Sequence, residues 1–264
     1  MNDSTQATFD RQSTDLNSRA HTLDVERTLL GRIGIRLQNG LERFVAWASR
    51  LPDRPVYDRR QFAWTQQLEA HSKLIRSELE QVMVERDNLP AFHQILDEVR
   101  SITSDDNWKT YWLFAAGVDC RENQLRCPET TALLRQVPGV LTAFFSILAP
   151  GKRIPPHRGA YNGVLRCHLG LIVPQPAEHV GIRVGNHICH WREGETLIFD
   201  DSYNHEVWND TDGWRVVLFI DFARPLRQPW HAMNRLFLGA ARFLPLLRRA
   251  NKRHHAWRRT FYQR

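Results

Sequence analysis

A run of short β-rich segments fills the second half of the chain, and this run limits the folds available to it. Each segment is rich in β-branched, leucine or aromatic residues and is bounded by glycine, proline or asparagine. The segments are FFSIL (144–148), VLRCHLGLIV (164–173), GIRV (181–184), HICHW (187–191), TLIF (196–199) and WRVVLFIDF (214–222). Short strands at such regular spacing are typical of a β-sandwich or barrel. We therefore expect a mainly β core.

Helical patterns flank this region on both sides. Apolar residues recur at three- and four-residue steps over 25–51 and 61–86, and again after Ala223, where Pro245 interrupts the pattern. The first residues are polar and aperiodic, which indicates disorder. The expected organisation is a disordered tail (1–22), a helical N-terminal region (23–104), a β domain (105–225) and a basic amphipathic C-terminal helical tail (226–264).

The positive charge of the chain is concentrated at its C-terminal end. From Arg224 on there are eleven lysine and arginine residues and no acidic residue, so the preceding residues sum to a small negative charge. This distribution points to an anionic partner surface, either a membrane or a nucleic acid. A nucleic acid is the less favoured partner, because the aromatic residues of the tail are mixed into an aliphatic face rather than arrayed for base stacking.

Targeting signals and cysteine usage indicate the cellular compartment of the protein. No segment has the charged start and apolar stretch of a signal peptide, and no apolar run reaches the roughly 18 to 20 residues that a spanning helix needs. The four cysteines contain no CxxC pair, and we expect them to be thiols in a reducing compartment. The expected location is the cytoplasm, including the inner face of the membrane.

Two of the twelve histidines stand out by their settings. His157 follows two prolines at the mouth of a strand, and His205 closes an acidic loop before a new strand. A jelly roll brings such strand ends together at one opening, where two imidazoles can share a metal. Neutral imidazole binds Fe(II), Zn and Cu, so residue type leaves the metal open. For the other histidines we expect structural roles, and for His254 and His255 exposure to solvent.

Two longer stretches carry a resemblance to a known family. They are SILAPGKRIPPHRGAYNGVLRCHLGLIVP (146–174) and GETLIFDDSYNHEVWNDTDGWRVVLFIDFARP (194–225). Both resemble the aspartyl/asparaginyl β-hydroxylase family, which includes bacterial hydroxylases of lipid A and ornithine-lipid acyl chains. The resemblance implies a double-stranded β-helix (jelly roll, cupin-like) with flanking N- and C-terminal α-helices. It also implies an Fe(II)- and 2-oxoglutarate-dependent dioxygenase that uses O2 to hydroxylate an unactivated C–H bond.

The same resemblance, carried over residue by residue, implies roles for particular side chains. His157 and His205 match the iron ligands and are the expected catalytic pair. The residues that match the 2-oxoglutarate contacts are Trp108, Ser146, Arg166, His168 and Arg215. A guanidinium can give two parallel hydrogen bonds to the distal carboxylate of 2-oxoglutarate. Residues two apart on one strand, such as Arg166 and His168, share a face and can reach one small dianion.

The metal site departs from the usual oxygenase pattern of two histidines and a carboxylate. The carboxylate normally stands two residues after the first histidine, and here that position is Gly159. The family that the chain resembles also has glycine there, which implies that water fills the position and that 2-oxoglutarate helps to hold the metal. Asp200 or Asp201 could reach the metal instead, although hydrogen bonding around the loop that carries His205 is the role we favour.

The motifs do not distinguish between two substrate classes, a lipid acyl chain and a peptide Asp or Asn side chain. The flanks favour lipid, because 29–51 and 231–249 combine apolar residues with arginine as in a helix that lies in a membrane interface. The alternative for both flanks is that they pack on the barrel. A third possibility is a non-catalytic cupin-like protein that binds metal or 2-oxoglutarate. The complete set of iron and cosubstrate residues argues against it.

Overall fold

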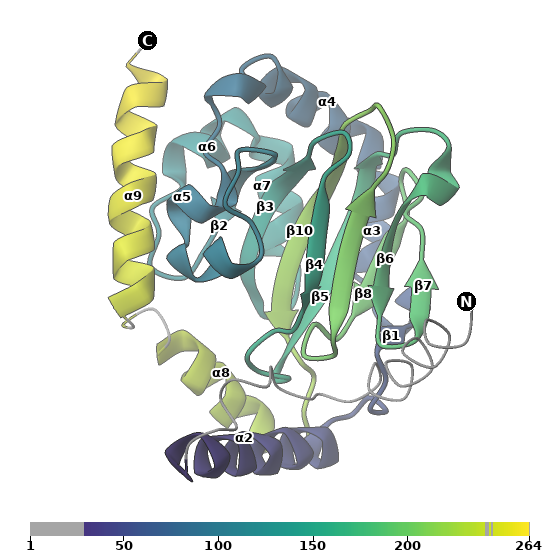
Figure 1. Cartoon of the computed structure of the whole chain (residues 1–264), viewed down its shortest axis with the longest axis vertical. Coiled ribbons are helices and arrows are strands. Elements are labelled where there is room, and N and C mark those ends of the chain that lie inside the picture. Colours follow the sequence, from purple (N-terminus) through teal and green to yellow (C-terminus); the bar gives the residue numbers. More distant parts are fainter. Residues whose placement is uncertain (1–28, 241–242, 244, 264) are drawn as a thin grey trace, which may run out of the picture.

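Two antiparallel β-sheets enclose the core of this computed structural model, which describes residues 29–240, 243 and 245–263 (Figure 1). The tail predicted over 1–22 lies outside the described residues. The larger sheet has the strand order β1-β8-β5-β10-β3-β2, and the smaller has the order β4-β9-β6-β7. The strands are β1 (Val56–Tyr57), β2 (Trp108–Phe114), β3 (Val140–Leu148), β4 (Arg153–His157), β5 (Val164–Ile172), β6 (Val180–Val184), β7 (His187–Cys189), β8 (Thr196–Phe199), β9 (His205–Asn209) and β10 (Arg215–Ala223).

Successive strands from β3 to β10 change sheet, apart from β6 and β7, as in a double-stranded β-helix. Strands β3, β5, β8 and β10 belong to the larger sheet, and β4, β6, β7 and β9 belong to the smaller. The first and the last of them, β3 and β10, pair with each other along their length, so the chain closes on itself. The prediction of a mainly β jelly-roll core with flanking α-helices is confirmed.

The central strand β10 is buried on both faces, which explains its continuous apolar sequence. Leu218 and Ile220 face the helices outside the larger sheet, whereas Val217 and Phe219 face the smaller sheet. The same alternation along β5 turns Arg166 and His168 inward, because their neighbours Cys167 and Leu169 belong to the outer cluster. The pleat therefore delivers polar side chains from β5 and β10 to the space between the sheets.

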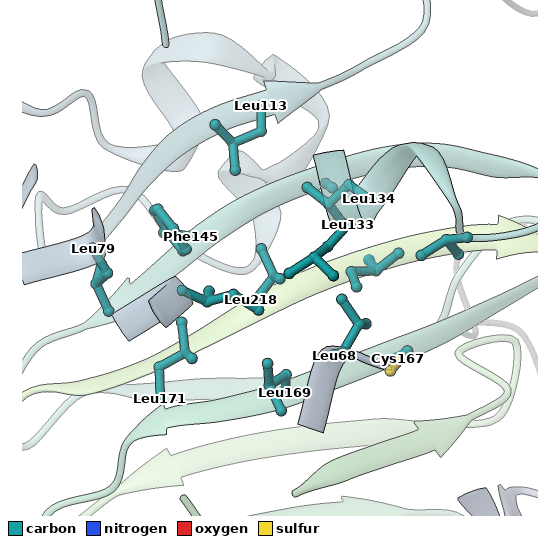
Figure 2. Packing of buried hydrophobic residues seen from close by; sticks show 14 of the residues in the cluster. Leu68, Leu79, Leu113, Leu133, Leu134, Phe145, Cys167, Leu169, Leu171 and Leu218 are labelled. Carbon is teal, nitrogen blue, oxygen red and sulfur yellow. The ribbon is translucent and has the colours of Figure 1, made fainter. Parts of the chain in front are cut away.

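The outer face of the larger sheet is covered by α3 (Thr65–Ala70), α4 (Ser72–Met83) and α7 (Pro128–Arg135). Figure 2 shows Leu68, Leu79 and Leu134 of these helices packed against Leu169 and Leu218 of the strands. This cluster stabilises the sheet from behind and leaves its inner face for the site.

The helical pattern over 61–86 is divided rather than continuous. It breaks between α3 and α4 at His71, whose backbone leaves the helical range (φ −103°, ψ 13°) and whose Nδ1 donates to the Gln67 carbonyl at 2.8 Å. The remaining helices are α2 (Leu29–Ala48), α5 (Phe92–Ile95), α6 (Arg121–Arg126), α8 (Trp230–Ala240) and α9 (Pro245–Tyr262), with 3-10 turns η2 (Arg59–Gln61), η3 (Arg86–Asn88), η4 (Asp97–Ser101) and η5 (Ala177–His179). None of the described helices has the length and apolarity needed to cross a membrane.

The C-terminal helix α9 is docked on the domain and much of its charge is neutralised there. Arg253 pairs with Asp97 at 2.6 Å, and Arg258 pairs with Asp119 at 2.9 Å. Arg249 lies 3.5 Å from Glu98. Acidic side chains of the domain therefore face the basic helix, so net charge alone is a poor guide to a partner for α9.

His254 contradicts the expectation that it lies in solvent. Its side chain is fully buried on the inner face of α9, with its ring centroid 5.4 Å from that of Trp257. Burial lowers the pKa of His254 to about 4, so the ring is neutral near pH 7. The adjacent His255 is exposed, as expected. Ala250, His254 and Arg258 are buried at four-residue spacing, so the helical repeat places His254 and not His255 on the face toward the domain.

Candidate active site

Neighbouring strands of the smaller sheet bring His157 and His205 together. The two residues are partners across the β4–β9 ladder, and their ring centroids are 4.1 Å apart. Each Nδ1 donates a hydrogen bond to the carbonyl two residues earlier, at 2.8 Å to Pro155 and 2.9 Å to Tyr203. Because the proton is held on Nδ1, the Nε2 lone pair of each neutral ring is available to a metal.

Burial keeps both imidazoles in the form that binds metal. Desolvation lowers the pKa of His157 to about 4 and holds the pKa of His205 well below its ordinary value. Both rings are therefore neutral near pH 7, and no proton has to leave before a metal binds.

Arg215 supplies an unpaired positive charge beside the histidines. Its side chain is 1% exposed, and within the described residues it has no carboxylate partner. Its nearest polar contacts are weak, at 3.4 Å to Ser146 Oγ and 3.5 Å to the Ser146 carbonyl, and its Nε has no hydrogen-bond partner. Burial lowers the pKa of Arg215 to about 9, which still leaves it charged at neutral pH. A buried cation without a counter-ion is costly, so this position favours an anionic ligand.

His168 and Trp108 complete the polar wall around this cation. Neither ring nitrogen of the buried His168 has a hydrogen-bond partner in the structure. Trp108 Nε1 donates to Ser146 Oγ at 2.9 Å, and both side chains are buried. These residues line one inner pocket together with His157, His205 and Arg215. Unsatisfied polar atoms thus converge on a site next to two imidazoles that are free to bind a metal.

Arg166 borders the same cavity, but its charge is already balanced. Its Nε donates to Asp221 Oδ1 at 2.8 Å, and its terminal nitrogen lies 2.9 Å from Asp201 Oδ2. The guanidinium also lies 4.2 Å from the Phe219 ring centroid. The structure therefore brings all seven predicted site residues to one place and separates the free Arg215 from the paired Arg166.

Sequence reasoning missed Asp221. The signal that could have revealed it is an acidic residue inside the apolar run WRVVLFIDF. Asp221 stands directly opposite Arg166 in the β5–β10 register, and this cross-strand position allows the pair to form.

The two aspartates before His205 have different roles. Asp200 is fully buried, accepts hydrogen bonds from the backbone and hydroxyl of Ser202 and pairs with Arg224. It thereby shapes the loop that presents His205. Burial raises the pKa of Asp201 to about 6, against the opposing charge of Arg166. Within the described residues no group of three histidine, cysteine or acidic side chains is placed to hold a metal.

Gly159 occupies the position where triad enzymes have their carboxylate, and it has no room for a side chain. A Cβ built there would lie 2.5 Å from Cγ and 2.7 Å from Oδ1 of Asp201. The Gly159 N–H also donates to the Asp201 carbonyl at 2.7 Å, so the two backbones are held together. The Asp201 carboxylate fills the space that a residue at 159 would need.

We expect Gly159→Ala to lower the free energy of unfolding by about 1–3 kcal/mol, because the added methyl displaces a buried, ion-paired carboxylate. Urea unfolding monitored by tryptophan fluorescence measures this change. The control is Gly40→Ala on α2, where a Cβ meets nothing within 4 Å and alanine is the better helix former. Equal stability of the Gly159→Ala protein and the wild type would contradict the close approach.

A larger cavity leads outward from the histidines and is mainly apolar. It has a volume of about 440 Å³ and includes His157, His205 and the Arg166–Asp201–Asp221 cluster at its polar end. Its apolar walls come partly from outside the barrel, from the segment after α5 and from the start of α9. These wall residues include Leu96, Val99, Ile102, Leu247 and Ala250. The arrangement suits a ligand with a long apolar part.

The chain is similar to known proteins in sequence and, more weakly, in structure. Residues 69–225 match the family model described as aspartyl/asparaginyl beta-hydroxylase. An ornithine lipid ester-linked acyl 2-hydroxylase from Rhizobium tropici is 46% identical over 225 residues, which cover 83% of this chain and 80% of the relative. The human aspartyl/asparaginyl beta-hydroxylase is 35% identical over 170 residues, which cover 61% of this chain and 21% of the human protein. A solved Pseudomonas putida prolyl-4-hydroxylase superposes with a TM-score of 0.38 at 16% identity, over 58% of this chain and 87% of that one.

Proposed function

Because the chain belongs to the aspartyl/asparaginyl β-hydroxylase family, we propose that it is an Fe(II)- and 2-oxoglutarate-dependent dioxygenase that hydroxylates a membrane lipid acyl chain. The observation that supports this reaction class best is the placement of Arg215 beside His157 and His205. A buried guanidinium without a counter-ion next to two imidazoles with free Nε2 atoms is what a metal-chelating dianion requires.

The residues of the inner pocket would have different roles, according to their chemistry. His157 and His205 would hold Fe(II) through Nε2, and water would fill the position left open at Gly159. Arg215 would bind the distal carboxylate of 2-oxoglutarate, with Ser146, His168 and Trp108 around it. With O2, iron and 2-oxoglutarate supply an oxidant for an unactivated C–H bond, and 2-oxoglutarate leaves as succinate and CO2.

Arg166 would orient the ligands rather than neutralise them. Its charge is already balanced by Asp201 and Asp221, so it adds little net attraction for a dianion. Its guanidinium, held over Phe219, would instead form the polar border between the bound cosubstrate and the apolar cavity. The apolar residues of the sandwich interior, such as Phe199 and Val207, keep water away from the histidines.

The apolar cavity supports a lipid acyl chain over an Asp or Asn side chain. A carboxylate or amide substrate is short and polar and gains nothing from the walls contributed by Val99, Ile102 and Leu247. The R. tropici relative is named for acyl 2-hydroxylation, and the human relative is named for hydroxylation of Asp and Asn. Hydroxylation of a protein Asp or Asn is therefore the alternative substrate class.

The decisive experiment supplies the purified protein with Fe(II), 2-oxoglutarate, O2 and either a bacterial lipid extract or Asp- and Asn-containing peptides. We expect succinate to form together with lipids that gain one oxygen atom, detected by mass spectrometry. Modified peptides with unmodified lipids would reverse the substrate assignment. A protein that binds neither Fe(II) nor 2-oxoglutarate would overturn the enzyme assignment altogether.

A further inference from the structure

Helices α2 and α8 present a shared apolar surface to solvent. They lie together at the lower end of the molecule (Figure 1), joined by Phe44 and Trp230, whose ring centroids are 4.9 Å apart. Eight of the twelve large hydrophobic side chains exposed in the described residues lie on or next to these two helices. We call this surface the α2–α8 face and define it by Leu37, Leu41, Trp47, Met233, Leu236 and Phe237. Exposed apolar side chains gathered on two neighbouring helices mark an interaction site.

The charges around the α2–α8 face are of one sign. Its exposed charged residues are arginines, among them Arg36, Arg43 and Arg235, and none of these three pairs with a carboxylate in the described part of the chain. Glu42 is the acidic residue of α2, and it is buried against Arg158. An apolar surface rimmed by arginine without exposed acid is complementary to anionic headgroups over acyl chains.

The same face is continuous with the rim of the cavity that contains the histidines. Ala160 lines that cavity, and its carbonyl accepts a hydrogen bond from Gln38 of α2 at 3.1 Å. Tyr161 donates to Asn234 of α8 at 2.9 Å, and its ring centroid is 5.2 Å from that of Phe237. The loop between β4 and β5 therefore joins the α2–α8 face to the cavity.

We propose that the α2–α8 face docks on the surface of an anionic bilayer, so that a lipid acyl chain can pass from the membrane into the cavity. This assignment narrows the membrane contact expected over 29–51 and 231–249 to α2 and α8, because Arg249 at the end of the second segment lies against Glu98 of the domain instead. The docking itself is independent of the reaction, whereas the delivery of an acyl chain rests on the proposed lipid hydroxylase function.

The test is co-sedimentation of the full-length protein with vesicles of phosphatidylcholine, with and without phosphatidylglycerol. We expect wild type to bind the phosphatidylglycerol vesicles and to release them as salt rises. The double variant Leu37→Glu/Leu236→Glu should bind at least tenfold more weakly, because both leucines enter the interface. These side chains are 70% and 77% exposed, so the fold should tolerate the change. The matched control is Leu125→Glu on α6, 73% exposed, which should bind as wild type does.

Three outcomes would overturn the docking proposal. The first is a wild-type protein that does not bind anionic vesicles, and the second is equal vesicle binding by the double variant. The third is a wild-type protein that forms a concentration-dependent dimer and binds no vesicles, when the double variant does not form the dimer. The last outcome would assign the face to a second copy of the chain.

Measurements of lipid hydroxylation test the docking proposal and the proposed function separately. In the double variant, hydroxylation of lipid in vesicles should fall more than hydroxylation of detergent-dispersed lipid. Vesicle binding by wild type without any lipid product would overturn the proposed function and leave docking standing. Equal loss on both forms of lipid would instead show that the substitutions act on the site and not on docking.

Discussion

Replacing His205 with alanine is expected to abolish succinate formation and to weaken Fe(II) binding about 100-fold or more. The reason is that the site has two protein ligands, and no carboxylate joins them within the described residues. If each ligand contributes on the order of 3 kcal/mol to metal binding, the loss of one costs a factor of at least ~100. Metal affinity is measured by titration in the absence of O2, and turnover by succinate release.

The matched control is His187→Ala on β7, because it is the same substitution on the same small sheet at an exposed position. This control should keep both metal binding and turnover. Thermal unfolding of each protein distinguishes loss of metal from loss of fold. Full succinate formation by the His205→Ala protein would falsify the assignment of His205 as a ligand.

Replacing Arg215 with methionine is expected to separate binding from stability. The Kd for 2-oxoglutarate in the Fe(II)-loaded protein without O2 should rise about 100-fold or more, since a buried charge pair is lost. The ligand-free protein should unfold at the same or higher urea concentration than wild type, because an unpaired buried cation has been removed. Ligand at about 100 times its wild-type Kd should stabilise the wild type by about 2.7 kcal/mol and the variant hardly at all.

Arg224→Met provides the contrast, because Arg224 is equally buried but is paired with Asp200. Breaking that pair leaves Asp200 without its counter-ion and should cost about 3–5 kcal/mol of stability. If Arg215→Met is destabilised as strongly as Arg224→Met, Arg215 is part of the structural framework and its assignment as an anion-binding residue is wrong.

Most strands could be located from the sequence alone, because their burial pattern is local. Strand β10, buried on both faces, appears as an apolar run, and the segment 164–173 corresponds to β5 at Val164–Ile172. The bounds of strand β4 at Arg153–His157 were not predicted, because Pro155 and Pro156 usually argue against a strand. Strand β4 lies at the edge of the smaller sheet. An edge strand pairs on one side only, so it tolerates prolines, which have no backbone N–H to donate.

The charge pairs of the site could not be predicted in this way. Arg166 and Arg215 look equivalent in the sequence, since both lie in strands near the matched motifs. The β5–β10 register places Asp221 opposite Arg166, whereas no acidic side chain within the described residues reaches Arg215. Register depends on contacts between distant segments, so a single sequence does not encode it in any local pattern.

The sequence by itself determined the β core, the resemblance that singles out His157 and His205, and the absence of a carboxylate at Gly159. These properties follow from residue type and local order along the chain. Only the tertiary structure decided that Arg215 is unpaired, that the carboxylate of Asp201 fills the space at Gly159, and that α9 is docked through buried His254. Those properties depend on which side chains meet across the fold, because burial and pairing arise only between segments that are distant in sequence.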